Sequence, residues 1–143
     1  MNTEKLAHLF TNYLQYFKEY NLAGVASCYH LPCTLNTPDK ISFVANEKDF
    51  QKEFNSIFTQ LKAANTSNVV ANKASYQPIS EQIILVNIDW DFFDANQEVF
   101  ADFSAIYHVL VIADECKIFN VTSHELSNSL ALEYSFTIPV LTK

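Results

Sequence analysis

The segment at 107–119, Tyr-His-Val-Leu-Val-Ile-Ala-Asp-Glu-Cys-Lys-Ile-Phe, contains two apolar runs separated by a short polar break. It belongs to a series of segments rich in Val, Ile, Phe and Tyr, which lie at 69–79, 82–94, 98–112 and 116–124. β-Branched and aromatic residues favour strands, and short polar breaks between such runs are typical of hairpin turns. The second half of the chain is therefore predicted to form antiparallel strands joined by hairpins.

The strand predicted at 98–112 is apolar on both of its faces. One face carries Phe100, Ile106, Leu110 and Ile112, and the other carries Val99, Phe103, Tyr107, Val109 and Val111. A strand of this kind is usually covered on both faces in the folded protein. Helices can cover one face of the sheet, so we expect the outer face to meet a second copy of the chain in a symmetric homodimer.

The first half of the chain shows helical spacing. One apolar stripe predicts a helix of about four turns and consists of Leu6, Leu9, Phe10, Tyr13, Leu14 and Phe17. A shorter helix is predicted at 21–29, and a third at 46–64 with Asn46 as its N-cap. A small hairpin around Pro38 lies between them, at 33–45. The predicted fold class is α+β, with three N-terminal helices packed on an antiparallel sheet.

Composition excludes several classes of function. Gly24 is the single glycine among 143 residues, whereas average usage would supply about ten. Dinucleotide-binding loops and P-loops need two or more glycines, so neither motif is possible, and no cofactor is expected. The net charge of −7, without clustered Lys or Arg, gives no electrostatic basis for binding nucleic acid or an anionic membrane.

The cysteines and the first residues of the chain bear on its compartment. Cys28, Cys33 and Cys116 have no disulfide-like spacing, and the N-terminus has no apolar run of signal-peptide length. We therefore expect a cytoplasmic protein with free, buried thiols. Cys28, His30 and Cys33 are close in sequence, but the spacing matches no known structural zinc site and lacks a second pair, so no metal is expected.

The run Asn-Leu-Ala-Gly-Val-Ala-Ser-Cys-Tyr-His-Leu-Pro at 21–32 and the strand-turn-strand at 107–119, taken with the order of the elements, carry a resemblance to a known fold. Over residues 4 to about 125 the chain resembles the nuclear-transport-factor-2-like superfamily, which includes ketosteroid isomerases, scytalone dehydratase and SnoaL-like polyketide cyclases. The resemblance implies a strongly curved sheet, the cystatin-like cone, closed by the helices around a pocket.

The resemblance also sets the expected domain boundaries. Residues 1–125 would form the superfamily domain, and 126–143 a C-terminal extension. Apolar residues alternate along this extension at Leu130, Leu132, Tyr134, Phe136, Ile138 and Val140. This pattern predicts either a further strand or an arm that lies across a partner subunit.

Candidate catalytic residues follow from laying the ketosteroid isomerase pattern on this chain. Tyr13 falls at the position of that family's helix tyrosine, and His108 lies near that of its late-strand acid. Thr37 stands where the general base would be, so the base is missing. Asp102 shares a strand face with His108, and Tyr13, His108 and Asp102 form the catalytic set. The alternative is that Tyr13 and His108 are hydrogen-bonded core residues.

The other candidates are aromatic and apolar residues that could line the pocket. The predicted ligand-binding residues are Tyr16 at the rim, Tyr29, His30, Phe54, Phe58, Trp90, Ile106 and Leu110. Asp89, Asp91 and Asp94 follow one face of the strand at 82–94, and we expect that face to be solvated.

Two functions of different classes are compatible with this sequence. The first is binding of a small apolar ligand, with a weak isomerase, dehydratase or cyclase activity. The second is an association module without catalysis, whose pocket is filled by its own side chains. An open cavity between helices and sheet favours the first, and a filled one favours the second.

Overall fold

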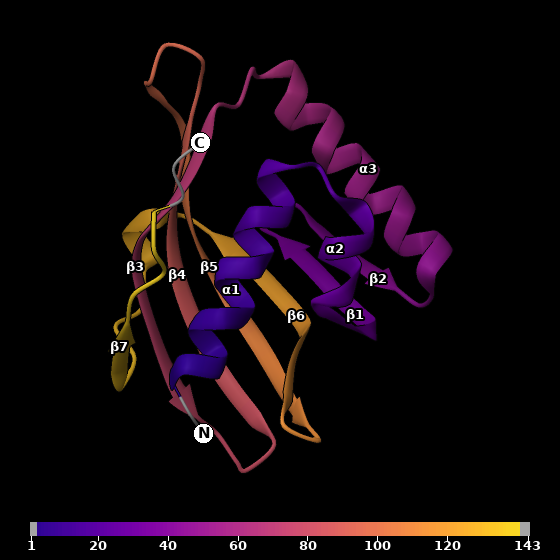
Figure 1. Cartoon of the computed structure of the whole chain (residues 1–143), viewed down its shortest axis with the longest axis vertical. Helices are drawn as coiled ribbons and strands as arrows, with labels where there is room; N and C mark the ends of the chain where they lie inside the picture. The colour runs from indigo at the N-terminus through magenta and orange to yellow at the C-terminus, as the bar shows by residue number, and fades with distance from the viewer. Residues whose placement is uncertain (1–2, 141–143) are drawn as a thin grey trace.

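The computed structural model describes residues 3–140 and has an α+β fold (Figure 1). The helices are α1 (Thr3–Lys18), α2 (Leu22–Ser27) and α3 (Glu47–Ala63), and η1 (Leu126–Asn128) is a short 3₁₀ turn. The strands are β1 (Tyr29–Thr37), β2 (Lys40–Val44), β3 (Asn68–Pro78), β4 (Ile83–Phe93), β5 (Val99–Ile112), β6 (Glu115–His124) and β7 (Tyr134–Phe136). Among these described helices, none is long and apolar enough to cross a bilayer.

All strands join one curved sheet in the order β2-β1-β6-β5-β4-β3-β7. Every neighbouring pair is antiparallel except β1 and β6, which run parallel. Helix α1 lies across the concave face, and α3 lies on the side of β1 and β2 (Figure 1). The α+β class is confirmed, but α3 follows the first two strands, so only α1 and α2 precede the whole sheet.

The helix boundaries follow from capping residues. Asn21 and Asn46 are the N-caps of α2 and α3, and their side chains accept from the backbone N–H groups of Gly24 and Asp49, each at 2.9 Å. Helix α2 is shorter than predicted because Cys28 closes it and the chain is already extended at Tyr29. Pro32 therefore lies within β1 rather than at the helix end.

Tight packing between α1 and α2 explains the single glycine. A Cβ atom on Gly24 would lie 2.3 Å from Cδ1 and 2.5 Å from Cγ of the Tyr16 ring. A Cβ atom would therefore force the Tyr16 ring to move, and a residue without a side chain allows the two helices to pack this closely.

Two of the hairpin turns use residues other than glycine in the left-handed conformation. Ala113 and Asp114 both have positive φ between β5 and β6, and Gln97 has φ of 62° between β4 and β5. Asp94 instead supports its turn through the side chain, which accepts from the N–H groups of Asn96 and Glu98.

The tail of the chain covers part of the outer face of the sheet. The Ser129 hydroxyl lies 2.7 Å and 2.8 Å from the two carboxylate oxygens of Asp89, and beyond it β7 pairs with β3. The expected solvated face is wrong at Asp89, which is 8% exposed, because the tail lies over it. Within this predicted extension the described residues form one short strand, β7, and residues 141–143 lie outside the described part of the chain.

Candidate functional site

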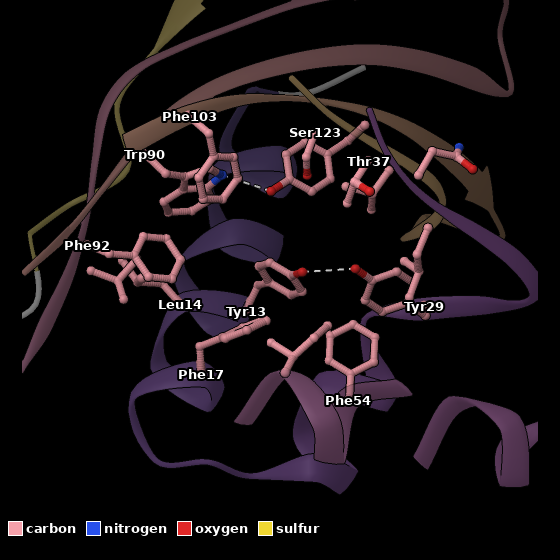
Figure 2. Close-up of a pocket in the computed structure, with 16 residues that line it drawn as sticks. Tyr13, Leu14, Phe17, Tyr29, Thr37, Phe54, Trp90, Phe92, Phe103 and Ser123 are labelled. Atoms are coloured by element: carbon pink, nitrogen blue, oxygen red, sulfur yellow. Dashed lines mark hydrogen bonds between the residues drawn. The ribbon is translucent and has the colours of Figure 1, made fainter. Parts of the chain in front are cut away.

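A cavity of about 260 Å³ lies between α1, α3 and the concave face of the sheet (Figure 2). Its walls are mostly aromatic and aliphatic. The lining residues are Tyr13, Leu14 and Phe17 of α1, Phe54 and Ile57 of α3, and Tyr29, Leu35, Asn36, Thr37, Val69, Trp90, Phe92, Phe103, Tyr107, Val121 and Ser123 of the strands. This volume is just below the range of about 300–1,000 Å³ that drug-sized ligands occupy.

Two hydrogen-bonded pairs supply the polar groups in the buried part of the cavity. The hydroxyl oxygens of Tyr13 and Tyr29 lie 2.8 Å apart, and the indole Nε1–H of Trp90 donates to the Tyr107 hydroxyl at 2.8 Å (Figure 2). Burial raises the pKa of the Tyr13, Tyr29 and Tyr107 hydroxyls well above the usual tyrosine value. All three phenols are therefore neutral and able to donate at physiological pH.

The cavity has a buried end and a more exposed end. Tyr13, Tyr29, Trp90 and Tyr107 are each less than 8% exposed. The polar lining residues Thr37 and Ser123 lie near the ends of β1 and β6, where Thr37 is exposed and Ser123 half-buried. The chemistry of the walls therefore changes from apolar with phenols in the interior to polar at this end.

The lining contains no group that titrates near neutral pH. Among the described residues that form it there is no Asp, Glu, His, Lys, Arg or Cys. Proton abstraction from a carbon atom requires a base with a pKa close to the working pH, and a phenol with a raised pKa is not one. The arrangement can enclose a mainly apolar molecule and donate hydrogen bonds to an acceptor atom that this molecule carries.

Four of the residues singled out in the sequence meet at this cavity, namely Tyr13, Tyr29, Phe54 and Trp90. Phe58 does not line it but packs behind it, with its ring centroid 5.5 Å from those of Phe17 and Tyr20. Tyr16 lies on another side of α1, against Gly24, and does not form a rim. His30, next to Tyr29 on β1, also lies outside the lining.

The expectation that Asp102 and His108 face the pocket is wrong, and so is that for Ile106 and Leu110. These four residues lie at even-numbered positions of β5, whereas Phe103 and Tyr107 face the cavity from odd-numbered ones. Side chains alternate between the faces of a strand, so the even-numbered set projects to the outer face.

His108 and Asp102, two of the candidate catalytic residues, lie on the outer face of the sheet and do not line the cavity. His108 Nδ1 lies 2.9 Å from the Asn120 amide nitrogen, its ring packs beside Phe119, and burial lowers its pKa. Asp102 is exposed and lies opposite Asp91 of β4. The catalytic set is therefore divided, because the sheet separates Tyr13 from His108 and Asp102.

The cysteines lie away from the cavity lining as free thiols. Burial raises the pKa of Cys28 and of Cys33 to about 11, so both are protonated at neutral pH. Within residues 3–140, no three His, Cys, Asp or Glu side chains are grouped so that they could hold a metal ion.

The sequence analysis did not predict many of the residues that line the cavity. Some of these residues were identifiable from the sequence. Leu14 and Phe17 belong to the same helical stripe as Tyr13, and Phe103 and Tyr107 share one strand face. Contributions from Val69 and Ser123 depend on how β3 and β6 are placed in the sheet, and no local pattern contains that information.

Comparison with solved structures shows the fold. An NTF2-like protein of unknown function from Shewanella oneidensis superposes with a TM-score of 0.71 at 12% identity, covering 87% of this chain and all of that one. An NTF2-like protein with a cystatin-like fold from Novosphingobium aromaticivorans gives 0.72 at 7% identity, covering 89% and 83%. A ketosteroid isomerase-like protein from Erwinia carotovora gives 0.66 at 12% identity, covering 88% and 98%.

Sequence comparison defines the family. No curated protein matches the chain. A family model described as NTF2-like protein (DUF6841) matches residues 4–126, which include α1 except its first residue, α2, α3 and β1 to β6. The resemblance inferred from the sequence is thus confirmed, and the chain belongs to the DUF6841 family of NTF2-like proteins.

Proposed function

We propose that this protein binds a small, neutral, mainly apolar molecule in the aromatic cavity. The observation that carries the proposal is an unfilled space of about 260 Å³ whose interior combines apolar walls with phenol and indole groups. Apolar walls with a few placed polar groups are the usual composition of small-molecule sites. The space would accommodate a ligand of about one or two rings.

Binding without catalysis fits the lining better than isomerase, dehydratase or cyclase chemistry. Tyr13 could polarise a carbonyl group, but no described residue of the lining can take a proton from carbon. His108 and Asp102 project from the opposite face of β5 and have no path to a ligand in the cavity. We therefore assign the cavity a role in binding or carrying its ligand.

The test uses calorimetric titration of the purified protein with α-methylstyrene as an apolar one-ring probe. Emission of Trp90, the single tryptophan, gives a second readout from within the cavity. Val121→Phe would place a ring in the cavity and abolish binding. Val111→Phe makes the same change on β5 outside the lining and leaves binding intact. Equal binding by both variants would overturn the proposal.

Self-association through the outer face is a second candidate, and exposed apolar side chains favour it. Ile41 and Phe43 of β2 are 81% and 66% exposed, on the side opposite to buried Ser42 and Val44. The tail covers the region around Asp89, so the surface available to a second copy is the part formed by β1, β2, β6 and the segment of β5 around His108. Light scattering at tens of micromolar should give a dimer mass that Phe43→Glu lowers to that of a monomer. A monomer in the unmodified protein would exclude this candidate.

A further inference from the structure

We infer that Tyr107, oriented by Trp90, is the residue that selects ligands carrying a neutral hydrogen-bond acceptor, such as a ketone oxygen. The inference rests on the proposed function, because it concerns a ligand in the same cavity. It assigns a specificity role to a β5 residue that lies beside His108 in sequence but on the other face of the strand.

Trp90 and Tyr107 form a hydrogen bond in which the donor is fixed. An indole N–H can only donate, so in the pair of Trp90 and Tyr107 the phenol oxygen is the acceptor. The Tyr107 hydroxyl hydrogen is not used in that bond. No acceptor for it is found among the described residues, although the side chain is only 3% exposed. Because Tyr107 lines the cavity, this hydrogen is available to an acceptor atom of a ligand.

The hydroxyl groups of Tyr13 and Tyr29 also have one hydrogen more than their shared hydrogen bond uses. Their oxygens share one hydrogen bond, which uses one of the two hydroxyl hydrogens, and the other hydrogen is left without a described acceptor. The rings of Tyr13 and Tyr107 are in edge contact, with centroids 6.3 Å apart. The buried end of the cavity therefore presents two O–H donors from adjacent rings.

These two donors differ in how firmly they are oriented. In the tyrosine pair either hydroxyl can donate to the other, so the free hydrogen can belong to Tyr13 or to Tyr29. In the other pair the indole fixes the direction, because Trp90 cannot accept. The Tyr107 hydrogen must then point away from the indole N–H, and Tyr107 is the better oriented donor.

The charge of the lining narrows the class of ligand. The described lining contains no Lys, Arg or His, so a carboxylate would be buried without a cation to compensate it. Burial keeps the phenols protonated, which suits a neutral acceptor. A ketone oxygen has two lone pairs and can accept from both donors, whereas a hydrocarbon would leave both hydrogens without a partner.

The experiment compares three probes of one shape: acetophenone, α-methylstyrene and benzoate, which carry C=O, C=CH₂ and a carboxylate on the same ring. Affinities are measured by calorimetry for the unmodified protein and for Tyr107→Phe. The matched control is Tyr76→Phe, because the Tyr76 hydroxyl is bonded to Thr3 at 2.7 Å and does not line the cavity.

We expect Tyr107→Phe to weaken acetophenone binding about three- to tenfold, the loss of one hydrogen bond, and to leave α-methylstyrene unchanged. Tyr76→Phe should change neither affinity. Benzoate should bind the unmodified protein at least about tenfold more weakly than acetophenone. Equal loss of both neutral probes in Tyr107→Phe, or tight binding of benzoate, overturns the inference while the proposed function stands. Failure of both neutral probes to bind the unmodified protein overturns the proposed function itself.

A spectroscopic measurement keeps the inference testable if Tyr107→Phe does not fold. The carbonyl stretch of ¹³C-labelled acetophenone, observed by infrared difference spectroscopy in the unmodified protein, should lie below its position in hexane because the oxygen accepts a hydrogen bond. A hexane-like stretch for bound acetophenone would show that no donor reaches it and would contradict the inference.

Discussion

The hydroxyl oxygens of Tyr13 and Tyr29 lie 2.8 Å apart and connect α1 to β1 inside the cavity. Both rings also contact other aromatic side chains: Tyr13 lies in edge contact with Phe17, and Tyr29 with Phe50 and Phe54. This hydrogen bond therefore joins the helix to the first strand at the place where the aromatic cluster of α3 meets the sheet.

A double-mutant cycle on Tyr13 and Tyr29 measures that bond. Tyr13→Phe or Tyr29→Phe alone leaves one buried hydroxyl without its partner and should cost about 1–2 kcal/mol of unfolding free energy. The double variant should cost about 1 kcal/mol less than the sum of the singles. Urea unfolding gives these values. Tyr13→Phe combined with Tyr76→Phe, which do not share a hydrogen bond, should be additive, and additivity in both pairs would show that the bond contributes nothing.

Gly24→Ala should destabilise the protein by about 1–3 kcal/mol, because the new Cβ would overlap the Tyr16 ring. Helix propensity alone predicts the opposite sign, a gain of about 1 kcal/mol. Thermal or urea unfolding distinguishes the two. In a Tyr16→Ala background, Gly24→Ala should be neutral or stabilising, and a stabilising effect in the unmodified protein would disprove the packing explanation.

Ser129→Ala should loosen the tail. The hydroxyl donates to the buried Asp89 carboxylate, whose other described donor is the Asn87 amide at 3.3 Å. Hydrogen bonds to charged groups contribute about 1.5–3 kcal/mol, and we expect a loss of that size together with faster proteolysis beyond residue 126. Ser127→Ala is the control, because Ser127 is exposed. Identical stability and cleavage of the two variants would contradict the role of Ser129.

Alkaline pH should destabilise the protein. A group whose pKa is raised by folding stabilises the native state below its unfolded pKa, and that contribution is lost as the pH rises through the folded value. For Cys28 and Cys33, with folded pKa values of about 11, the loss falls between about pH 9 and pH 11, at up to about 1.4 kcal/mol per pH unit for each thiol. Cys33→Ala should reduce the slope of unfolding free energy against pH in this window, and an unchanged slope would argue against burial of the thiol.

The ranges of the helices and strands were largely predictable, because the residues that mark each helix or strand lie within it. Strand residues 69–79 and 98–112 were placed within one residue of β3 and β5, and Asn46 caps α3 as expected. The second helix was predicted two residues too long at its end, since small residues such as Ala26 and Ser27 do not mark where a helix stops.

The candidate site was only partly predictable, for a reason specific to β5. A strand that is apolar on both faces does not show which face points to the helices, and the prediction placed His108 rather than Tyr107 in the pocket. The burial of Asp89 had a different cause. It depends on Ser129, 40 residues later, and no pattern within the strand at 82–94 reports a contact made by the tail.

The short strands at the two ends of the sheet have a consequence for aggregation. The described sheet ends in β2 with five residues and β7 with three, whereas β3 to β6, which are the longest strands, each have a neighbouring strand on both sides. An unpaired strand edge is a template for adding further chains, and its hazard grows with its length. The tail that crosses the outer face thus also shields the middle of β3, at Ala74, Ser75 and Tyr76. The fold thereby limits fibre growth at its two margins.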